Sequence, residues 1–191
     1  MKSVVGAFPP TSIVNSDEFR GAMRHLAGGV SVITGGRGRD ISGMTVTSVT
    51  SLTIAPPTLI VAINRAASTL PLLRRYGAFG VSILAGDQRE VAERFTGKGG
   101  HAGAKRFVGS SWKAGPAGVP LLEGALAAIG CEVEEIIERH SHAIVLGSVV
   151  SIAASEASSA LAYWRGRYVA VERNASHDED VRLPAPRALW D

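Results

Sequence analysis

Hydroxyl side chains are concentrated in one short segment of the sequence, from Gly43 to Ser51. Thr45, Thr47 and Ser48 lie within it, and each can donate and accept hydrogen bonds, so the segment is a candidate edge for binding a polar ligand. Hydroxyl residues are also common on half-exposed strands. From the residues alone, an ordinary strand is the more usual interpretation.

A second polar group, Asn64, Arg65, Ser68 and Thr69, lies between a predicted strand and a predicted helix. Free backbone amides and the helix dipole favour a phosphate at such a position. The alternative is that Ser68 caps the helix and Asn64 ends the strand. The two roles are compatible.

The sequence lacks the motifs of the common hydrolases and metalloenzymes. It contains neither H-E-x-x-H nor Gly-x-Ser-x-Gly, and no pair of carboxylates at a recognisable catalytic spacing. Gly35, Gly36 and Gly38 follow a predicted strand but miss the G-x-G-x-x-G spacing of a Rossmann loop. Cys131 is the only cysteine, which excludes an internal disulfide and a cysteine-based metal site. We expect no metal.

Composition and charge narrow the class of protein further. Hydrophobic residues make up 46% and charged residues 19% of 191 residues, which indicates one folded domain. The net charge is only +3 and the cations are scattered, so nucleic acid is not an expected partner. No segment approaches the roughly 18 apolar residues that suggest a membrane span. The apolar stretch at the N-terminus is too short for a signal peptide. We expect a soluble cytoplasmic protein.

The hydrophobic pattern changes repeatedly between helical and strand periodicity. Helices are predicted from Asn15, with Glu18 in capping-box spacing, to Gly28; from Ser68 to Gly77; and from Asp87, paired with Glu90, to Gly97. Strand segments are predicted at 30–34, 41–54, 58–64, 79–84, 127–133, 143–152 and 168–171. Residues 95–120, rich in Gly, Ser and Lys and with few apolar residues, are predicted to be a long surface loop rather than a core element.

Because strands do not alternate regularly with long helices, the order favours a mainly β, antiparallel barrel with a few peripheral helices. The predicted division is an N-terminal extension at 1–14, one domain at 15–172 and a loose tail at 173–191.

Several segments, taken together, resemble the flavin reductase-like family with the FMN-binding split barrel. They are FRGAMRHLAGGVSVIT, GMTVTSVTSLTIAPPTLIVAINRAASTL, FGVSILAGDQREVAERF, HAIVLGSVV and YWRGRYVAV, from about Phe19 to about Val171. The resemblance implies an antiparallel split-barrel fold. It also implies an enzyme that oxidises NADH or NADPH and delivers reduced flavin, FMN or FAD, to a separate monooxygenase. It also implies a homodimer with flavin at or near the subunit interface.

The resemblance assigns roles to individual residues. It places the isoalloxazine along the strand that carries Gly43, Thr45, Val46, Thr47, Ser48 and Ser51, and the flavin phosphate at Asn64, Arg65, Ser68 and Thr69. Other residues implied to lie near the flavin are Ser82, Ile83, Phe95 and Tyr168. His142 matches a family histidine that contacts the nicotinamide, and a histidine ring could orient the carboxamide there. Each also has a structural interpretation: core packing for Ile83 and Phe95, and a surface histidine for His142.

Charged residues outside these segments give weaker hypotheses. Arg89 and Arg106 are candidate phosphate ligands or plain solvated charges, and Arg165 and Arg167 mark a basic strand end. Lys98, His101 and Lys105, on the long loop, are candidates for the phosphates of a nicotinamide dinucleotide folded over the flavin.

Two other functions remain open from the sequence: a flavin-binding electron-transfer module without rapid nicotinamide turnover, and an oxidase of the related pyridoxamine phosphate oxidase type. The residues do not separate FMN from FAD, or NADH from NADPH.

Overall fold

The computed structural model describes residues 14–156 and 159–172, so the predicted tail at 173–191 and nearly all of the predicted N-terminal extension lie outside the described residues. The helices are α1 (Ser16–Met23), α2 (Thr69–Tyr76) and α3 (Arg89–Phe95), with 3-10 turns η1 (Lys98–Gly100), η2 (Gly103–Phe107) and η3 (Pro116–Gly118). The strands are β1 (Gly28–Gly29), β2 (Ser31–Arg37), β3 (Asp40–Val46), β4 (Val49–Ile54), β5 (Pro57–Asn64), β6 (Ala78–Ile83), β7 (Trp112–Ala114), β8 (Pro120–Leu122), β9 (Ala127–Arg139), β10 (His142–Ala154), β11 (Ser159–Trp164) and β12 (Arg167–Glu172).

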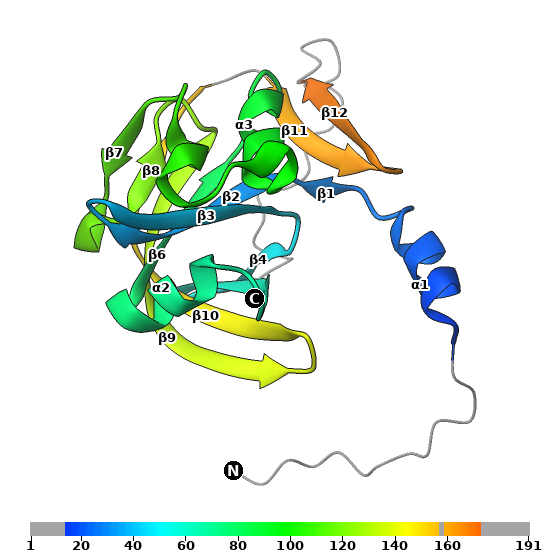
Figure 1. Ribbon diagram of the computed structural model, residues 1–191, viewed down its shortest axis with the longest axis horizontal. Coiled ribbons are helices and arrows are strands. Elements are labelled where there is room, and N and C mark those ends of the chain that lie inside the picture. The colour runs from blue at the N-terminus through cyan, green and yellow to red at the C-terminus, as the bar shows by residue number, and fades with distance from the viewer. Residues whose placement is uncertain (1–13, 157–158, 173–191) are drawn as a thin grey trace, which may run out of the picture.

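Seven antiparallel strands form the main sheet, in the order β3-β2-β6-β9-β10-β5-β4. Strands β3 and β4 lie at its two opposite edges, yet only Thr47 and Ser48 separate them in the chain. The two edges must therefore approach each other at that link, which curls the sheet into the split barrel seen in Figure 1. The predicted mainly β, antiparallel split barrel is confirmed. The segment 41–54, predicted as one run, is two strands.

The barrel closes around an aliphatic core. Ile33, Ile63, Phe79 and Val145 come from β2, β5, β6 and β10, and all four are fully buried. Helix α2 covers this core with Leu70 and Leu73, and it ends at Gly77, whose φ of 64° is the left-handed conformation that favours glycine. The prediction for this helix is confirmed.

A second core lies beneath α3 and is aromatic. The rings of Phe95, Phe107 and Trp112 pack on one another with centroid separations of 4.9–5.3 Å. Phe107 and Trp112 lie within residues 95–120, where a surface loop rather than a core element was predicted. That prediction was wrong: two widely spaced aromatic residues anchor the segment, although its composition is otherwise typical of a surface loop.

A small three-stranded sheet, β1-β11-β12, projects beyond the barrel above β2, and α1 stands away from the body (Figure 1). The predicted capping box of α1 is present, since Asn15 and Glu18 bond each other's backbone amides reciprocally. The helix ends at Met23 and not at Gly28, because Gly28 and Gly29 pair with β11. Strand β11 was not predicted.

Helix α3 begins differently from the prediction. Its N-cap is Gln88, with no side-chain capping bond, so the capping pair expected from Asp87 and Glu90 is wrong. The Gln88 side chain instead accepts a hydrogen bond from the Ala85 amide at 2.9 Å, which fixes the turn that enters the helix. Across the described residues, no helix is both long and apolar enough to cross a membrane.

Candidate functional site

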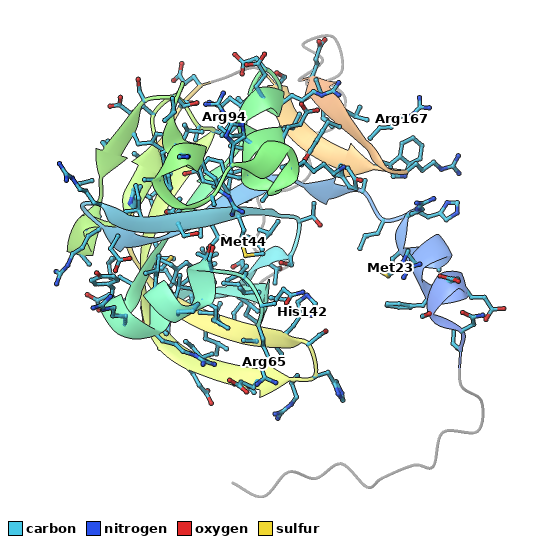
Figure 2. The ribbon with its side chains drawn as sticks, viewed as in Figure 1. Met23, Met44, Arg65, Arg94, His142 and Arg167 are labelled. Atoms are coloured by element: carbon cyan, nitrogen blue, oxygen red, sulfur yellow. The ribbon has the colours of Figure 1, made fainter. Side chains whose placement is uncertain are left out.

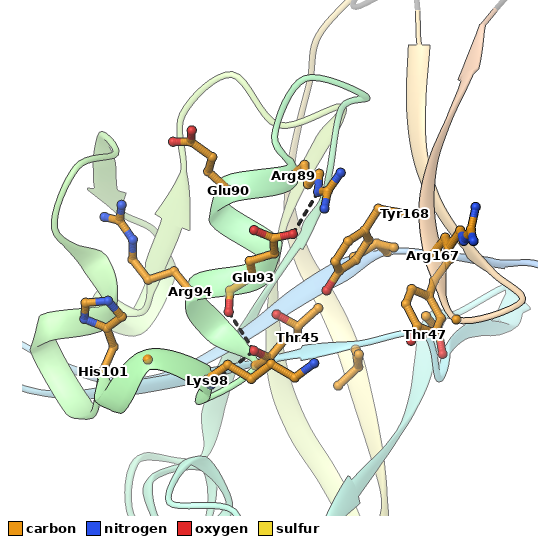
Figure 3. Close-up of a pocket in the computed structure, with 16 residues that line it drawn as sticks. Thr45, Thr47, Arg89, Glu90, Glu93, Arg94, Lys98, His101, Arg167 and Tyr168 are labelled. Carbon is orange, nitrogen blue, oxygen red and sulfur yellow. Dashed lines mark hydrogen bonds and ion pairs between the residues drawn. The ribbon is translucent and has the colours of Figure 1, made fainter.

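A cavity of about 1160 Å³ opens between the end of β3, helix α3, the η1 turn and the β11–β12 hairpin (Figure 3). Its volume is above the roughly 300–1000 Å³ usual for one small ligand. The lining residues are Val30, Thr45, Val46, Thr47, Arg89, Glu90, Glu93, Arg94, Thr96, Lys98, Gly99, His101, Tyr163, Gly166, Arg167 and Tyr168. Four of the predicted site residues are among them: Thr45, Val46, Thr47 and Tyr168.

The end of β3 gives the cavity a polar edge. The Thr45 hydroxyl donates to the carbonyl of Ala92 in α3 at 2.6 Å, which ties the strand to the helix. Thr47 is exposed, and its hydroxyl makes no hydrogen bond within the described part of the chain. Because β3 is an edge strand, one side of its backbone is free of strand pairing. The cavity therefore presents both backbone groups and a free hydroxyl.

The rest of the cavity lining is rich in cations. Arg89, Arg94, Lys98 and Arg167 contribute four positive charges, against two carboxylates from Glu90 and Glu93. Arg89 pairs with Glu93 at 2.8 Å, whereas the other three cations form no ion pair among residues 14–156 and 159–172. Uncompensated guanidinium and ammonium groups suit phosphate oxygens.

Arg106 holds the loop that carries Lys98 and His101 against the barrel. Its guanidinium donates to the backbone carbonyl of His101 at 3.0 Å and also to the carbonyl of Gly43 in β3. Arg106 was a candidate phosphate ligand from the sequence. In the structure, its donors already serve two carbonyls, which makes it a clamp between the loop and β3.

Tyr168 faces the cavity beneath Arg89, and its hydroxyl points toward the side that carries Thr45 (Figure 3). The guanidinium of Arg89 lies 5.9 Å from the centre of the Tyr168 ring. Burial, followed by the nearby charge of Glu93, raises the pKa of the Tyr168 phenol. The phenol therefore keeps its proton near neutral pH and remains a hydrogen-bond donor.

A second group of predicted residues surrounds a separate hollow of about 450 Å³, lined among others by Asn64 and Arg65. His142 begins β10 and pairs directly with Asn64 of β5, and its Nδ1 lies 2.9 Å from the Ser141 hydroxyl. Arg65 is paired with Glu138 at 2.9 Å. Figure 2 shows Arg65 and His142 on the lower part of the molecule and Arg94 and Arg167 on the upper part.

The two arginines of this second group are held in ion pairs with one carboxylate. Glu138 binds both Arg74 and Arg65, and Arg74, followed by Arg65, lowers the pKa of its carboxyl. Arg65 also donates to the backbone carbonyl of His140 at 3.2 Å. The guanidinium of Arg65 is thus occupied, in contrast to Lys98 and Arg167.

Ser48 connects the two groups. Its hydroxyl donates to the carbonyl of Ala62 in β5 at 2.8 Å, so the link between β3 and β4 is fastened two residues before Asn64. Ser51, in contrast, lies further along β4 on an exposed part of the strand.

The remaining predicted site residues lie inside the fold. Gly43 is buried, and a Cβ there would lie 2.7 Å from the Phe95 ring, so glycine lets β3 pack on α3. Ser82 is fully buried and accepts a hydrogen bond from the Leu122 amide at 3.1 Å. Ile83 is half-buried beside the aliphatic core.

The two hydroxyls at the start of α2 also have internal partners. The Ser68 hydroxyl lies 2.8 Å from that of Ser42, and the buried Thr69 hydroxyl donates to the same Ser42 oxygen at 3.4 Å. Ser68 occupies the N-cap position but makes no side-chain capping bond. The predicted capping role of Ser68 is therefore wrong, and its hydroxyl instead ties α2 to β3.

Sequence reasoning missed Arg94, Glu93 and Tyr163 as cavity residues. Arg94 is five residues after Arg89 on the same short helix, and the two side chains point in opposite directions in Figure 3. Tyr163 belongs to β11, which the sequence pattern did not predict. Lys98 and His101 were recognised from charge and position, and both line the cavity.

Comparison with known proteins agrees with this fold and cavity. The family model described as "Flavin reductase like domain" matches residues 23–172. The FMN reductase (NADH) RutF of Pseudomonas syringae is 37% identical over 170 residues, covering 87% of this chain and 92% of that protein. The 4-hydroxyphenylacetate 3-monooxygenase reductase component of Pseudomonas aeruginosa is 36% identical over 146 residues, covering 76% and 86% of the two chains.

The fold has counterparts among solved structures as well. The NADH:FAD oxidoreductase SgcE6 of Streptomyces globisporus superposes with a TM-score of 0.76 at 27% identity, covering 86% of this chain and all of that one. The fold is that of solved flavin reductases. The chain belongs to the flavin reductase-like family.

Proposed function

We propose that this protein is a flavin reductase that transfers a hydride from NADH or NADPH to FMN or FAD. The observation that carries the proposal is the 1160 Å³ cavity, which combines a hydroxyl-bearing strand edge with uncompensated cations. Hydride transfer from nicotinamide to flavin needs position and electrostatics from the protein, because both reacting centres belong to the cofactors. Family membership and the activities for which the relatives are named support the same reaction.

The end of β3 is proposed to hold the flavin ring. The protons of the Thr45 and Ser48 hydroxyls are donated to carbonyls, so these two oxygens are left to accept hydrogen bonds from a ligand. Thr47 keeps its proton free and can donate. Val46, at the cavity wall, offers an apolar contact to the ring. The bound flavin supplies the hydride acceptor; these residues orient it.

Residues behind β3 are proposed to act as supports. Gly43 and Phe95 set the distance between β3 and α3, and Ser82 holds β6 to β8. Ile83 packs against the aliphatic core, and Ser51 lies on the exposed face of β4, beyond the link that follows β3. None of these needs to touch the ligand for the site to depend on it.

We keep Asn64, Arg65, Ser68 and Thr69 as the proposed phosphate end of the flavin site. At this site the Glu138 carboxylate competes with the phosphate for the guanidinium of Arg65. His142 is proposed to orient the nicotinamide. Its Nδ1 is engaged with Ser141, and Nε2 has no hydrogen-bond partner among the described residues. A ring held at one nitrogen can present the other in a fixed direction.

A homodimer is proposed because large apolar side chains are exposed in two places. Helix α1 buries no residue, and its Phe19 and Met23 are 61% and 44% exposed. On the barrel, Leu52 and Ile54 of β4 are 46% and 61% exposed. Large apolar side chains exposed in groups are typical of protein interfaces.

Sedimentation equilibrium tests the proposed homodimer. We expect a dimer, and a monomer at micromolar concentration would contradict the proposal.

The reduced flavin is proposed to pass to a separate oxygenase, by analogy with the reductase component from Pseudomonas aeruginosa. A cytoplasmic location stays a prediction, based on the single cysteine. Cys131 is buried, and burial raises its thiol pKa to about 12, so it is poorly reactive.

One experiment tests the activity. The purified full chain is mixed with FMN, FAD or riboflavin and with NADH or NADPH, and the nicotinamide absorbance is followed. We expect it to fall with at least one pair. No fall with any pair would overturn the proposal. Tight flavin binding without nicotinamide oxidation would instead favour an electron-transfer module.

A further inference from the structure

The cavity contains an aromatic corner that the flavin ring site does not account for. Tyr163 of β11 and Tyr168 of β12 pair directly across their hairpin, and their ring centroids are 5.3 Å apart at 63°. Both line the cavity. Tyr163 is 40% exposed, and Tyr168 is half-buried. The corner thus offers aromatic surface to whatever enters the cavity.

Cations lie near the two tyrosine rings of this corner. Arg89 lies over Tyr168, and Arg167 precedes Tyr168 on β12. Lys98 extends along the cavity from the opposite wall (Figure 3). Aromatic rings and a guanidinium stack well on a nucleobase, while free cations suit the phosphates attached to it. The combination suits a nucleotide, which carries both a base and phosphates.

The cavity is also larger than a flavin ring requires. One continuous space includes Thr45 and Thr47 at the edge of β3 and Tyr163 and Tyr168 at the hairpin. A ligand that binds at β3 and carries a second aromatic group through a diphosphate would use both ends. The two ends and the cations are supplied by elements far apart in sequence.

We propose that Tyr163 and Tyr168 bind the adenine base, and Lys98 and Arg167 the diphosphate, of an adenine dinucleotide. The proposal rests on the proposed function and extends it. The ligand chemistry is the adenosine diphosphate half that FAD and NAD(P)H share. If FAD supplies it, the FAD diphosphate lies at Lys98 and Arg167, and the Asn64 to Thr69 site is left for the phosphate of FMN. FMN, which lacks this half, does not use the corner.

The test separates binding of this half from catalysis. ADP alone is titrated into the full chain by calorimetry, comparing the wild type with Tyr163→Leu and Tyr163→Phe. We expect Tyr163→Leu to weaken ADP binding about 5- to 30-fold, because a base loses its stacking surface. Tyr163→Phe keeps the ring and binds ADP nearly as the wild type does. Tyr76→Leu, a ring outside the lining of this cavity, serves as the matched control and leaves ADP binding unchanged.

Kinetics distinguish the two sources of the ADP group. If FAD supplies it, Tyr163→Leu raises the KM for FAD and leaves that for FMN unchanged. If NADH supplies it, the KM for NADH rises with either flavin. Unchanged ADP affinity in a folded Tyr163→Leu variant would overturn the inference. Since calorimetry needs no turnover, that outcome is distinct from a failure of the reductase activity.

Discussion

Two regions of this barrel contain the predicted ligand-binding residues, and they differ in how their charges are used. At the upper cavity, Lys98 and Arg167 have no ion-pair partner in the described chain. At the lower hollow, Arg65 and Arg74 share the carboxylate of Glu138. Both regions are basic by count, but only the upper cavity has lining cations without an ion-pair partner in the described chain. A basic residue near a cavity is therefore informative only when its partners are known.

The largest expected effect tests this contrast directly, with two matched double variants that each remove two charges. The Lys98→Gln, Arg167→Gln double variant should raise the KM for the adenine dinucleotide that binds there, NADH or FAD, about tenfold, because charged hydrogen bonds to its phosphates are lost. Arg65→Gln with Arg74→Gln should change it less than about threefold. Steady-state kinetics with each flavin measure both. Equal effects would show that the Glu138 pairing does not withdraw Arg65 from the ligand.

A smaller effect is expected from the clamp at Arg106. Arg106→Lys keeps the positive charge, but the ammonium group cannot donate to the Gly43 and His101 carbonyls at the same time, as the guanidinium does. The loop that carries Lys98 should therefore become more mobile. We expect the KM for the dinucleotide to rise about fivefold with kcat little changed, and amide exchange at residues 97–107 to accelerate. Arg139→Lys, on an exposed strand end, is the control. Unchanged exchange would contradict a clamping role.

The lower region should still matter if His142 contacts the nicotinamide. His142→Ala should lower kcat/KM for NADH about threefold, the value of one neutral hydrogen bond. His142→Gln, which can present a nitrogen donor, should recover part of the loss. A full rate in His142→Ala would assign the histidine to the surface.

The smallest effect concerns stability. Arg74 and Arg65 lower the pKa of the Glu138 carboxyl below its ordinary value of 4.5. The ion pairs therefore stabilise the fold above pH 4.5, and this contribution is lost as the pH falls through the lowered pKa. The melting temperatures of wild type and Glu138→Gln should differ slightly at pH 6 and converge in acid. Because the groups are exposed, the difference should be small. A difference that stays constant as the pH falls from 6 into acid would contradict this origin.

Much of the fold followed from local pattern. The α1 capping box, the β2–β3 hairpin and the α2 helix with its glycine stop are set by residues close in sequence, so they were predictable. The long run 41–54 was not resolved into two strands, because β3 and β4 have similar composition and differ only in their pairing partners. Strand β11 and the aromatic anchors Phe107 and Trp112 were also missed, since their roles depend on distant contacts.

The sequence by itself determined the class of the protein, an antiparallel β domain of the flavin reductase-like family, and it identified the hydroxyl edge at Thr45 to Ser48. Only the tertiary structure decided which cations are free. Glu138 neutralises Arg65 across 73 residues of chain, and Arg106 clamps Gly43 across 63. Local periodicity carries no information about such pairs, because they form only when strands distant in sequence become neighbours in the barrel.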